Sequence, residues 1–256
     1  MTVTPRKSLT TRLASDEADR AAVYGLRYEV FVAEMGGDGT LVDHDLAQEK
    51  DRFDPFCDHL MLLDQNRGAE IADQIVGTYR MMSASGAKAA GAFYSEGEYD
   101  LSALQTSGRK LMECGRSCLR RDYRGGLSMQ MLWSGLAAQV EATGAEILFG
   151  VASFPGSDPA LHRTAISWLH HTYLAAKPLR TKARKAVFDT GDLVDADDID
   201  RVQVVRDMPA LIKAYLRMGG RVGDGAFVDH AFNTCDVCMI LDLNDVPAAM
   251  RARLTS

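Results

Sequence analysis

The sequence predicts an α/β fold, a single domain whose mixed sheet is flanked by helices. Apolar runs of strand length alternate along the chain with amphipathic segments of helical spacing. Two of the apolar runs, 59–63 and 74–82, are separated by the turn Asn66-Arg67-Gly68, as in an antiparallel strand pair. Because no repeat, low-complexity segment or long polar linker divides the chain, we expect one domain over residues 1–256.

The first helix is predicted to begin after Ser15, which can cap the acidic start Asp16-Glu17, and to end at Gly36-Gly37. Within it, Arg27 and Phe31 share one face, since they are four residues apart. The later elements follow from the same patterns. They are a short helix near 101–105, a strand 110–119, a helix 128–143, a strand 146–151, a helix 157–176, a loop 190–200, a helix 209–218 and a strand 237–243.

The composition limits the classes of protein to which the chain can belong. With 256 residues, 46% hydrophobic and 25% charged, the chain can bury a sizeable core. No apolar stretch has the roughly 20 residues needed to span a bilayer, and Met1–Thr10 lacks the apolar core of a secretory signal, so we expect a cytoplasmic protein. A net charge of −6 argues against nucleic acid as a partner, since phosphate neutralisation needs a basic surface.

The five cysteines fit reduced thiols rather than a disulfide framework. Cys235 and Cys238 form one CxxC pair, but they lie in or beside a predicted strand, on which residues three apart face opposite sides. We therefore expect no metal site. The chain also has no GxSxG, P-loop or GxGxxG motif, so serine-hydrolase and nucleotide chemistry lack support.

The most informative segment runs from Glu113 to Gly126. Here a carboxylate and an arginine open a strand that continues into a basic, glycine-containing turn and then a helix. Free N–H groups at a helix start attract phosphate, as do nearby arginines. The residues predicted to bind a phosphate-bearing group are Arg120, Arg121, Arg124, Gly125 and Gly126. A plain structural turn is the alternative.

Several charged residues lie beside or within apolar elements, where a charge is unfavourable unless it is paired with an opposite charge or serves a function. Arg80 lies in an apolar strand and would be costly to bury unless paired with Asp51 or Asp54. Glu113 and Arg116 would face opposite sides of a regular strand, but a bulge at Gly115 would bring them together and splay the sheet. A structural ion-pair network is the alternative to a catalytic site.

Four motifs resemble, in order, the RxxxF, ExDxFD, GxxR and ExxR signatures of acyl-homoserine-lactone synthases. They are Arg27-Tyr28-Glu29-Val30-Phe31, Glu49-Lys50-Asp51-Arg52-Phe53-Asp54, Gly77-Thr78-Tyr79-Arg80 and Glu113-Cys114-Gly115-Arg116. Three more motifs give a closer resemblance to the related bacterial L-ornithine N-alpha-acyltransferases of ornithine-lipid synthesis, sometimes labelled haemolysin-like. They are Gly36-Gly37-Asp38-Gly39, Arg124-Gly125-Gly126 and Phe232-Asn233-Thr234-Cys235-Asp236-Val237. The resemblance covers about Arg12 to Leu243.

The resemblance implies a GNAT-like (acyl-CoA N-acyltransferase) fold with a mixed, mostly antiparallel central sheet flanked by helices. It also implies an acyl donor carried by acyl carrier protein, with no bound cofactor. The GNAT pyrophosphate motif R/Q-x-x-G-x-G/A is only partly kept, because Leu127 and Met129 replace its small residues. The 3-hydroxyacyl-phosphopantetheine of an acidic carrier protein suits the arginine turn better than acetyl-CoA does.

The implied reaction is attack of the ornithine alpha-amine on a 3-hydroxyacyl thioester, which gives lyso-ornithine lipid. By the resemblance Glu113 is the general base, and backbone N–H groups around Gly115 to Cys118 hold the oxyanion. Arg80 and Arg116 hold the amino-acid carboxylate or organise the site, while Asp51 and Asp54 take the cationic side chain or orient Arg80. Arg27 and Phe31 complete the predicted acceptor site.

Several alternatives stay open. The acceptor can be glutamine or another amino acid, or the chain can be a homoserine-lactone synthase, an acyl-enzyme former through Cys114 or Cys118, or a non-catalytic acyl-carrier or lipid-binding module. Transient contact with the inner membrane is also open, because the product carries a long acyl chain. An amphipathic stretch around Trp168 is the one hint of an anchor.

Overall fold

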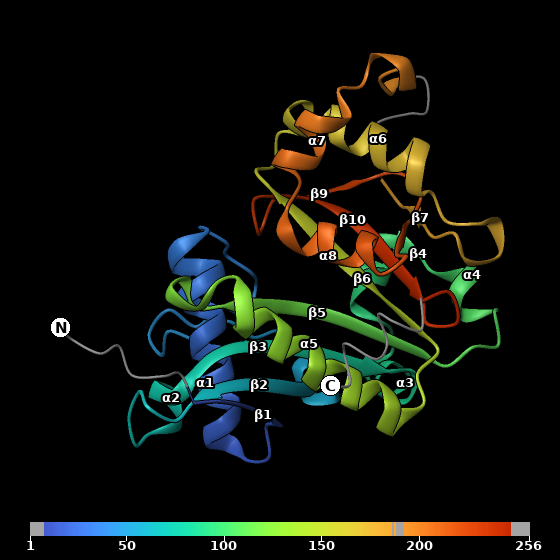
Figure 1. Cartoon of the computed structure of the whole chain (residues 1–256). Coiled ribbons are helices and arrows are strands. Elements are labelled where there is room, and N and C mark those ends of the chain that lie inside the picture. The colour runs from blue at the N-terminus through green and yellow to red at the C-terminus, as the bar shows by residue number, and fades with distance from the viewer. Residues whose placement is uncertain (1–7, 186, 188–191, 247–256) are drawn as a thin grey trace.

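The computed structural model describes residues 8–185, 187 and 192–246, and its central sheet has the strand order β1-β2-β3-β5-β6-β10-β8, with β9 also paired to β10 (Figure 1). These strands are β1 Leu9–Leu13, β2 Asp58–Asp64, β3 Ile75–Ser83, β5 Leu111–Leu119, β6 Ile147–Pro155, β8 Arg221–Val222, β9 Phe227–Asp229 and β10 Thr234–Asp242. Every pair is antiparallel except β5 with β6. The prediction of a mixed, mostly antiparallel sheet is confirmed.

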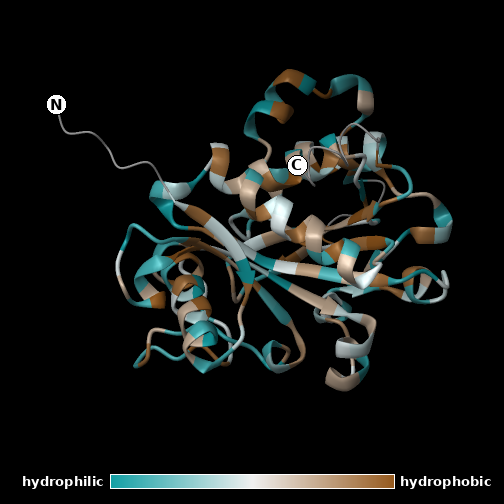
Figure 2. Cartoon of the chain, turned by 60° about the horizontal axis from the view of Figure 1, so that its bottom comes forward, coloured by the Kyte–Doolittle hydropathy of each residue, from teal (hydrophilic) through white to brown (hydrophobic). Residues whose placement is uncertain are grey.

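Helices cover both faces of this sheet. Alternate residues of β2 point to opposite faces of the sheet. Leu60 and Leu62 pack in one hydrophobic core with the long helix α5, and Met61 and Leu63 pack in another with α1. Figure 2 shows that the helices around the sheet carry both hydrophilic and hydrophobic residues, as expected of helices with one buried side. The helices are α1 Glu17–Arg27, α2 Ile71–Gln74, α3 Ala84–Ala90, α4 Ser102–Gln105, α5 Gly126–Thr143, α6 Arg163–Tyr173, α7 Arg201–Asp207 and α8 Ala210–Arg217.

Most predicted elements are present with shifted ends. The first helix is capped by Asp16 rather than Ser15, since the Asp16 side chain accepts the Asp19 N–H, and it continues beyond α1 as a π-helical segment, Tyr28–Glu34. The helix predicted from Ser157 begins instead as a 3₁₀ turn, Pro159–His162, and α6 ends at Tyr173. The predicted loop 190–200 lies partly outside the described residues. The sequence did not predict β1, α3 or α7.

The sheet opens between β5 and β6. Their parallel pairing covers Leu111, Met112 and Glu113, opposite 147–149, and does not continue in the described residues. On the other side of β5 the register with β3 shifts, so that one extra residue lies between Gly115 and Cys118, and Arg116 has a positive φ of 49°. This is the bulge predicted at Gly115, and it turns β5 away from β6 just where the cavity described below begins.

Gly150 keeps the two strands close at the point where they part. A β carbon at this position would lie 2.1 Å from the carbonyl oxygen of Cys114. We expect Gly150→Ala to lower the free energy of unfolding by about 1–3 kcal/mol or more, since overpacking forces the strands apart. Urea unfolding measures this. In the control Gly25→Ala, the new β carbon meets nothing within 4 Å in α1, and we expect stability to rise by about 0.5–1 kcal/mol.

The stretch around Trp168, the predicted hint of a membrane anchor, packs into the protein. Trp168 is 8% exposed, and its ring packs against Tyr173 with centroids 5.0 Å apart. Trp168 itself is therefore not exposed for contact with a membrane, because the apolar side of α6 is used in the core, and contact with the inner membrane stays a prediction. Within the described part of the chain, no helix is both long and apolar enough to cross a membrane.

Candidate active site

A cavity of about 1130 Å³ lies where β5 and β6 part. Its walls come from β3, β5, β6, α5, α8 and β10, together with the segment Tyr94–Gly97, which precedes the short strand β4 (Tyr99–Asp100). Ligand pockets usually measure about 300–1,000 Å³, so this one has room for a substrate with a long chain. Four methionines line it, and their flexible side chains suit an apolar chain of variable shape. They are Met35, Met82, Met129 and Met218.

Glu113 lies in the cavity wall, at the last paired position of β5 with β6. One carboxylate oxygen accepts the Tyr94 N–H at 2.8 Å and the other accepts the Ser95 N–H at 2.7 Å. Burial raises the pKa of Glu113, although these N–H donors act in the opposite direction. The result is a held carboxylate with increased affinity for a proton, at the edge of a substrate-sized space.

Three arginines and three carboxylates form a buried network beside Glu113. The Arg27 guanidinium binds Glu49 at 2.5 Å and Asp54 at 2.6 Å. Arg80 binds Asp51 at 2.7 Å and Asp54 at 3.0 Å. Arg116 completes the network with bonds of 3.3 Å to Glu49 and 3.2 Å to Asp51. The six formal charges sum to zero, so each buried charge is compensated.

The network keeps its acids ionised. Burial alone would raise the pKa of Asp54, but Arg27 and Arg80 hold it well below its ordinary value. The pKa of Glu49 and that of Asp51 are also lowered by arginines despite burial.

Arg116 additionally lies over two aromatic rings, with its guanidinium carbon 4.7 Å from the Tyr94 centroid and 4.6 Å from the Phe232 centroid.

The predicted site residues divide into two groups. Phe31, Arg80, Glu113 and Arg116 line the cavity. Arg27, Asp51 and Asp54 are not among the lining residues, and Arg27 is 0% exposed. Asp51 and Asp54 bind Arg80, which is the second of the two roles expected for them.

The predicted donor turn lies at the cavity mouth. Arg124, Gly125 and Gly126 are lining residues, and α5 begins at Gly126, preceded by Gly125 with a φ of 87°. The charge of this turn is partly offset: Arg124 binds Glu34 through two bonds, and Arg120 binds Glu29 at 2.7 Å. Arg121 is exposed. The arginine cluster is thus less free than the sequence suggested, and its contact with a donor stays a prediction.

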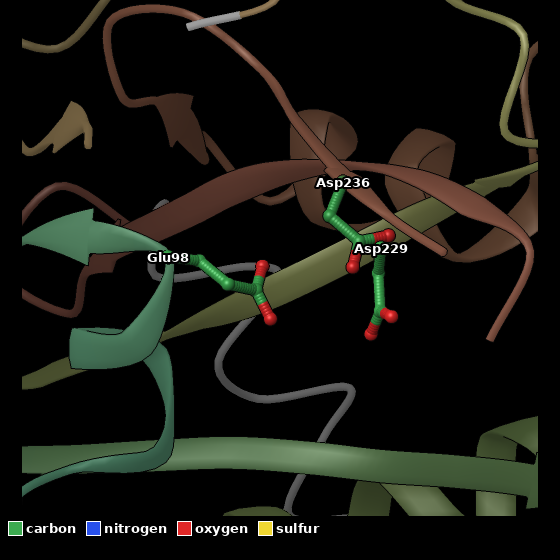
Figure 3. Close-up of side chains that lie close together, drawn as sticks. All are labelled: Glu98, Asp229 and Asp236. Carbon is green, nitrogen blue, oxygen red and sulfur yellow. The ribbon is translucent and has the colours of Figure 1, made fainter. Parts of the chain in front are cut away.

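A second set of acids was missed by the sequence reasoning. Figure 3 shows Glu98, Asp229 and Asp236 with their carboxylates close together, and one oxygen from each lies within 4.8 Å of the others. Burial, followed by the neighbouring carboxylates, raises the pKa of Glu98 to about 9. Burial also raises the pKa of Asp236 to about 6. A signal was present only for Asp236, which directly precedes the predicted strand 237–243 and belongs to the motif Phe232 to Val237.

The raised pKa of Glu98 predicts a pH-dependent stability. As pH rises from 4.5, the ordinary pKa, to about 9, the Glu98 carboxyl ionises in the unfolded chain while it stays protonated in the folded one. The folded state therefore loses stability across this window. We expect Glu98→Gln to lack this loss, so that its melting temperature exceeds that of the wild type by an amount that grows with pH. A constant difference from acid to alkaline pH would contradict the assignment.

The cysteines near the cavity are poor nucleophiles. Burial raises the pKa of Cys114 and raises that of Cys118 to about 12, so neither thiolate is favoured. This argues against the acyl-enzyme alternative.

The CxxC pair does not lie on one face. Cys235 and Cys238 pack in separate hydrophobic clusters, as expected for residues on opposite sides of a strand.

Comparison with known proteins gives consistent matches. Residues 26–134 match the family model described as an acetyltransferase (GNAT) domain. The L-ornithine N(alpha)-acyltransferase of Rhodobacter capsulatus is 49% identical over 235 residues, which is 92% of this chain and 90% of that protein. The L-ornithine N(alpha)-acyltransferase of Agrobacterium fabrum is 38% identical over 241 residues, 93% of this chain and 82% of that protein.

Solved structures support the fold. TofI, crystallised in a ternary complex with an inhibitor and MTA, superposes with a TM-score of 0.52 at 13% identity and covers 95% of both chains. FeeM, an N-acyl amino acid synthase from uncultured soil microbes, gives a TM-score of 0.50 at 12% identity and covers 93% of both. At these identities the likeness concerns the fold alone, and together with the family match over residues 26–134 it confirms the predicted GNAT-like fold.

Proposed function

The chain belongs to the L-ornithine N(alpha)-acyltransferase family and is an acyltransferase, and from this premise we propose that it moves a 3-hydroxy fatty acyl group from acyl carrier protein to the alpha-amine of L-ornithine. The product is lyso-ornithine lipid, the first intermediate of ornithine-lipid synthesis. The observation that carries the proposal is the buried Glu113 carboxylate in the wall of a cavity large enough for an acyl chain.

Glu113 is the general base in this proposal. The attacking amine must lose a proton, and a carboxylate whose pKa is raised by burial accepts that proton more readily than an exposed one. The amine nitrogen bonds to the thioester carbon, the thiol of the donor leaves, and the proton passes to Glu113 directly or through one water. The edge of β5 that β6 leaves after Glu113 can supply N–H groups to the oxyanion.

The charged network positions these groups. Arg80 and Arg116 line the cavity and are candidates for contact with the acceptor carboxylate, although each also binds the network acids. Arg27, Asp51 and Asp54 hold those two arginines and Glu49 in place from behind. We therefore assign Arg27, Asp51 and Asp54 to positioning rather than to direct substrate contact. Phe31 lines the cavity, packed against Phe232, and contacts the substrate.

The donor is assigned to the turn before α5. Arg121 is exposed, and Arg124, Gly125 and Gly126 border the cavity mouth. A single phosphopantetheine phosphate needs fewer contacts than the diphosphate of coenzyme A, and the bulky Leu127 and Met129 restrict the latter. An acidic carrier protein would dock beside this turn. Such a donor places the reaction in the cytoplasm, with delivery of the product to the inner membrane.

Mass spectrometry tests the acceptor and the donor together. Purified protein is mixed with a pool of amino acids and either 3-hydroxyacyl carrier protein or the same acyl group on coenzyme A. We expect acyl-ornithine as the main product, formed faster from the carrier protein. If glutamine is acylated instead, the proposed reaction stands but ornithine is not the acceptor. A diffusible lactone would favour the homoserine-lactone synthase alternative, and no transfer at all would favour a binding module.

A further inference from the structure

The cluster formed by Glu98, Asp229 and Asp236 borders the cavity of Glu113 through Asp229 and Asp236, with Glu98 outside the lining residues, and it has no part in the chemistry assigned so far. Glu98 comes just before β4, Asp229 ends β9, and Asp236 lies on β10, so three separate segments bring the carboxylates together (Figure 3). Asp229 and Asp236 are lining residues of the cavity. The cluster is therefore reachable by a molecule that also reaches Glu113.

Among the described residues no cation is paired with the carboxylates of this cluster, and Arg116, whose charge acts on Glu98 and Asp236, is paired instead with Glu49 and Asp51. Glu98 is 6% exposed and Asp236 is 3% exposed, and within the described ranges no arginine, lysine or histidine forms an ion pair with any of the three acids. One oxygen of Glu98 and one of Asp236 are buried with no hydrogen-bond partner among the described residues. The Glu98 side chain points toward the other two acids in Figure 3. Buried carboxylates left unpaired in this way are unfavourable unless a positively charged group binds to them.

We infer that Glu98, Asp229 and Asp236 form the subsite that binds the side-chain ammonium of a diamino-acid acceptor, an inference that rests on the proposed function. An ammonium has three N–H donors and no acceptor, so it can give one hydrogen bond to each of three carboxylates. The sequence assigned this role to Asp51 and Asp54, whose oxygens are bound to arginines in the structure. The Glu98 cluster has the free oxygens that those two residues lack.

A divalent metal fits the cluster less well than an ammonium does. Magnesium and calcium take about six to eight oxygen ligands, whereas this site brings together one oxygen from each of three side chains. One oxygen of Asp229 already accepts two backbone N–H groups, from Ala231 at 2.8 Å and from Phe232 at 3.1 Å. Metal binding is therefore an outcome that the experiment must distinguish.

The position of the cluster explains which amine reacts. Tyr94 and Ser95, whose N–H groups hold Glu113, lie in the same short segment as Glu98. A diamino acid can thus place one amine at Glu113 and the other at the cluster. The cluster keeps the distal amine protonated and hydrogen-bonded, so that it is not nucleophilic, while Glu113 takes the proton of the alpha-amine.

The test compares two acceptors, L-ornithine and L-norvaline, which has the same carbon chain without the terminal amine. The measured quantity is the ratio of kcat/KM for ornithine to kcat/KM for norvaline. We expect the wild type to favour ornithine strongly, and we expect Asp229→Asn, Glu98→Gln and Asp236→Asn each to lower the ratio by about ten- to a hundredfold. Each variant removes a partner that is ionised when the ammonium is bound, since a bound cation favours the charged form of the neighbouring carboxyls, Glu98 included. An increase in KM for ornithine should carry most of the change.

Amide variants suit this test because they preserve shape. An asparagine at 229 can still accept the N–H groups of Ala231 and Phe232, and the loss of a like charge does not threaten folding, which a melting curve checks. Asp197→Asn, at an exposed acid outside the cavity, is the control and should keep the wild-type ratio. All assays are repeated with a chelator and with added magnesium.

Each outcome separates the inference from the proposed function. If the wild type acylates ornithine and the three variants keep its preference over norvaline, the inference is overturned and the proposed function stands. A preference that disappears with the chelator and returns with magnesium also overturns it, because the cluster would then be a metal site. A wild type that acylates neither amino acid overturns the proposed function, and the inference with it.

Discussion

Glu113→Gln should lower kcat by about a hundred- to ten-thousandfold, the usual contribution of a positioned general base. The amide has nearly the same shape as the carboxylate, and its oxygen can still accept the N–H of Tyr94 or Ser95, but it cannot take a proton from the amine. The measurement is single-turnover acyl transfer with saturating donor and acceptor. Donor affinity should stay near the wild-type value, because the base does not bind the thioester.

The loss should be smaller at high pH, where a larger fraction of the amine is already unprotonated. Glu141→Gln is the matched control, since Glu141 is exposed on α5 outside the cavity. Its activity should equal that of the wild type. If Glu113→Gln retains more than about a tenth of the wild-type kcat at neutral pH, the base lies elsewhere, given that proton transfer by such a group contributes at least about a hundredfold.

Arg27→Met should lower the free energy of unfolding by about 3–5 kcal/mol, the cost of breaking a buried ion pair by removing one partner. Methionine fills similar volume but leaves Glu49 and Asp54 buried with one cation fewer. The measurement is urea unfolding at neutral pH, with activity followed in parallel. Arg27 does not line the cavity. In the fraction of enzyme that stays folded, any change in activity should therefore come from displaced Arg80 and Arg116 side chains and not from a lost contact with substrate.

Arg20→Met provides the control on the same helix. Among the described residues Arg20 pairs only with the Glu17 carboxylate, at 3.6 Å, and its side chain is 42% exposed. We expect a change of about 0–1 kcal/mol, as for other surface pairs. An effect of Arg27→Met no larger than that of Arg20→Met would mean that the buried network does not stabilise the fold.

Local patterns in the sequence predicted much of the fold. Strong strand and helix patterns predicted β2, β3, β5 and α5, and a glycine between two charged residues predicted the bulge in β5. The elements that were missed have weak local signals. β1 is a five-residue edge strand with two threonines and an arginine, and α7, Arg201–Asp207, has three valines that favour strands, but it is capped by Asp200.

The candidate site was predicted only in part, because long-range packing decides it. The carboxylates and arginines were each identified, yet their pairing into a neutral network depends on how residues 49–54 fold over β3 and β5. Asp229 was missed because it meets Asp236 only through the pairing of β9 with β10. Glu98 was missed because it comes from a distant segment, which reaches β10 where the hydroxyl of the neighbouring Tyr99 donates to the carbonyl oxygens of Gly225 and Asp236. No local pattern marks such a meeting.

Tandem mass spectrometry of the product tests the central claim most directly. The enzyme is given 3-hydroxyacyl carrier protein and ornithine that is isotopically labelled at the alpha-nitrogen alone, and the fragment that carries the acyl amide is identified. The account predicts that this fragment contains the label, since the alpha-amine is the one that attacks. An acyl group on the unlabelled distal nitrogen, or no acyl-ornithine at all, would contradict the account.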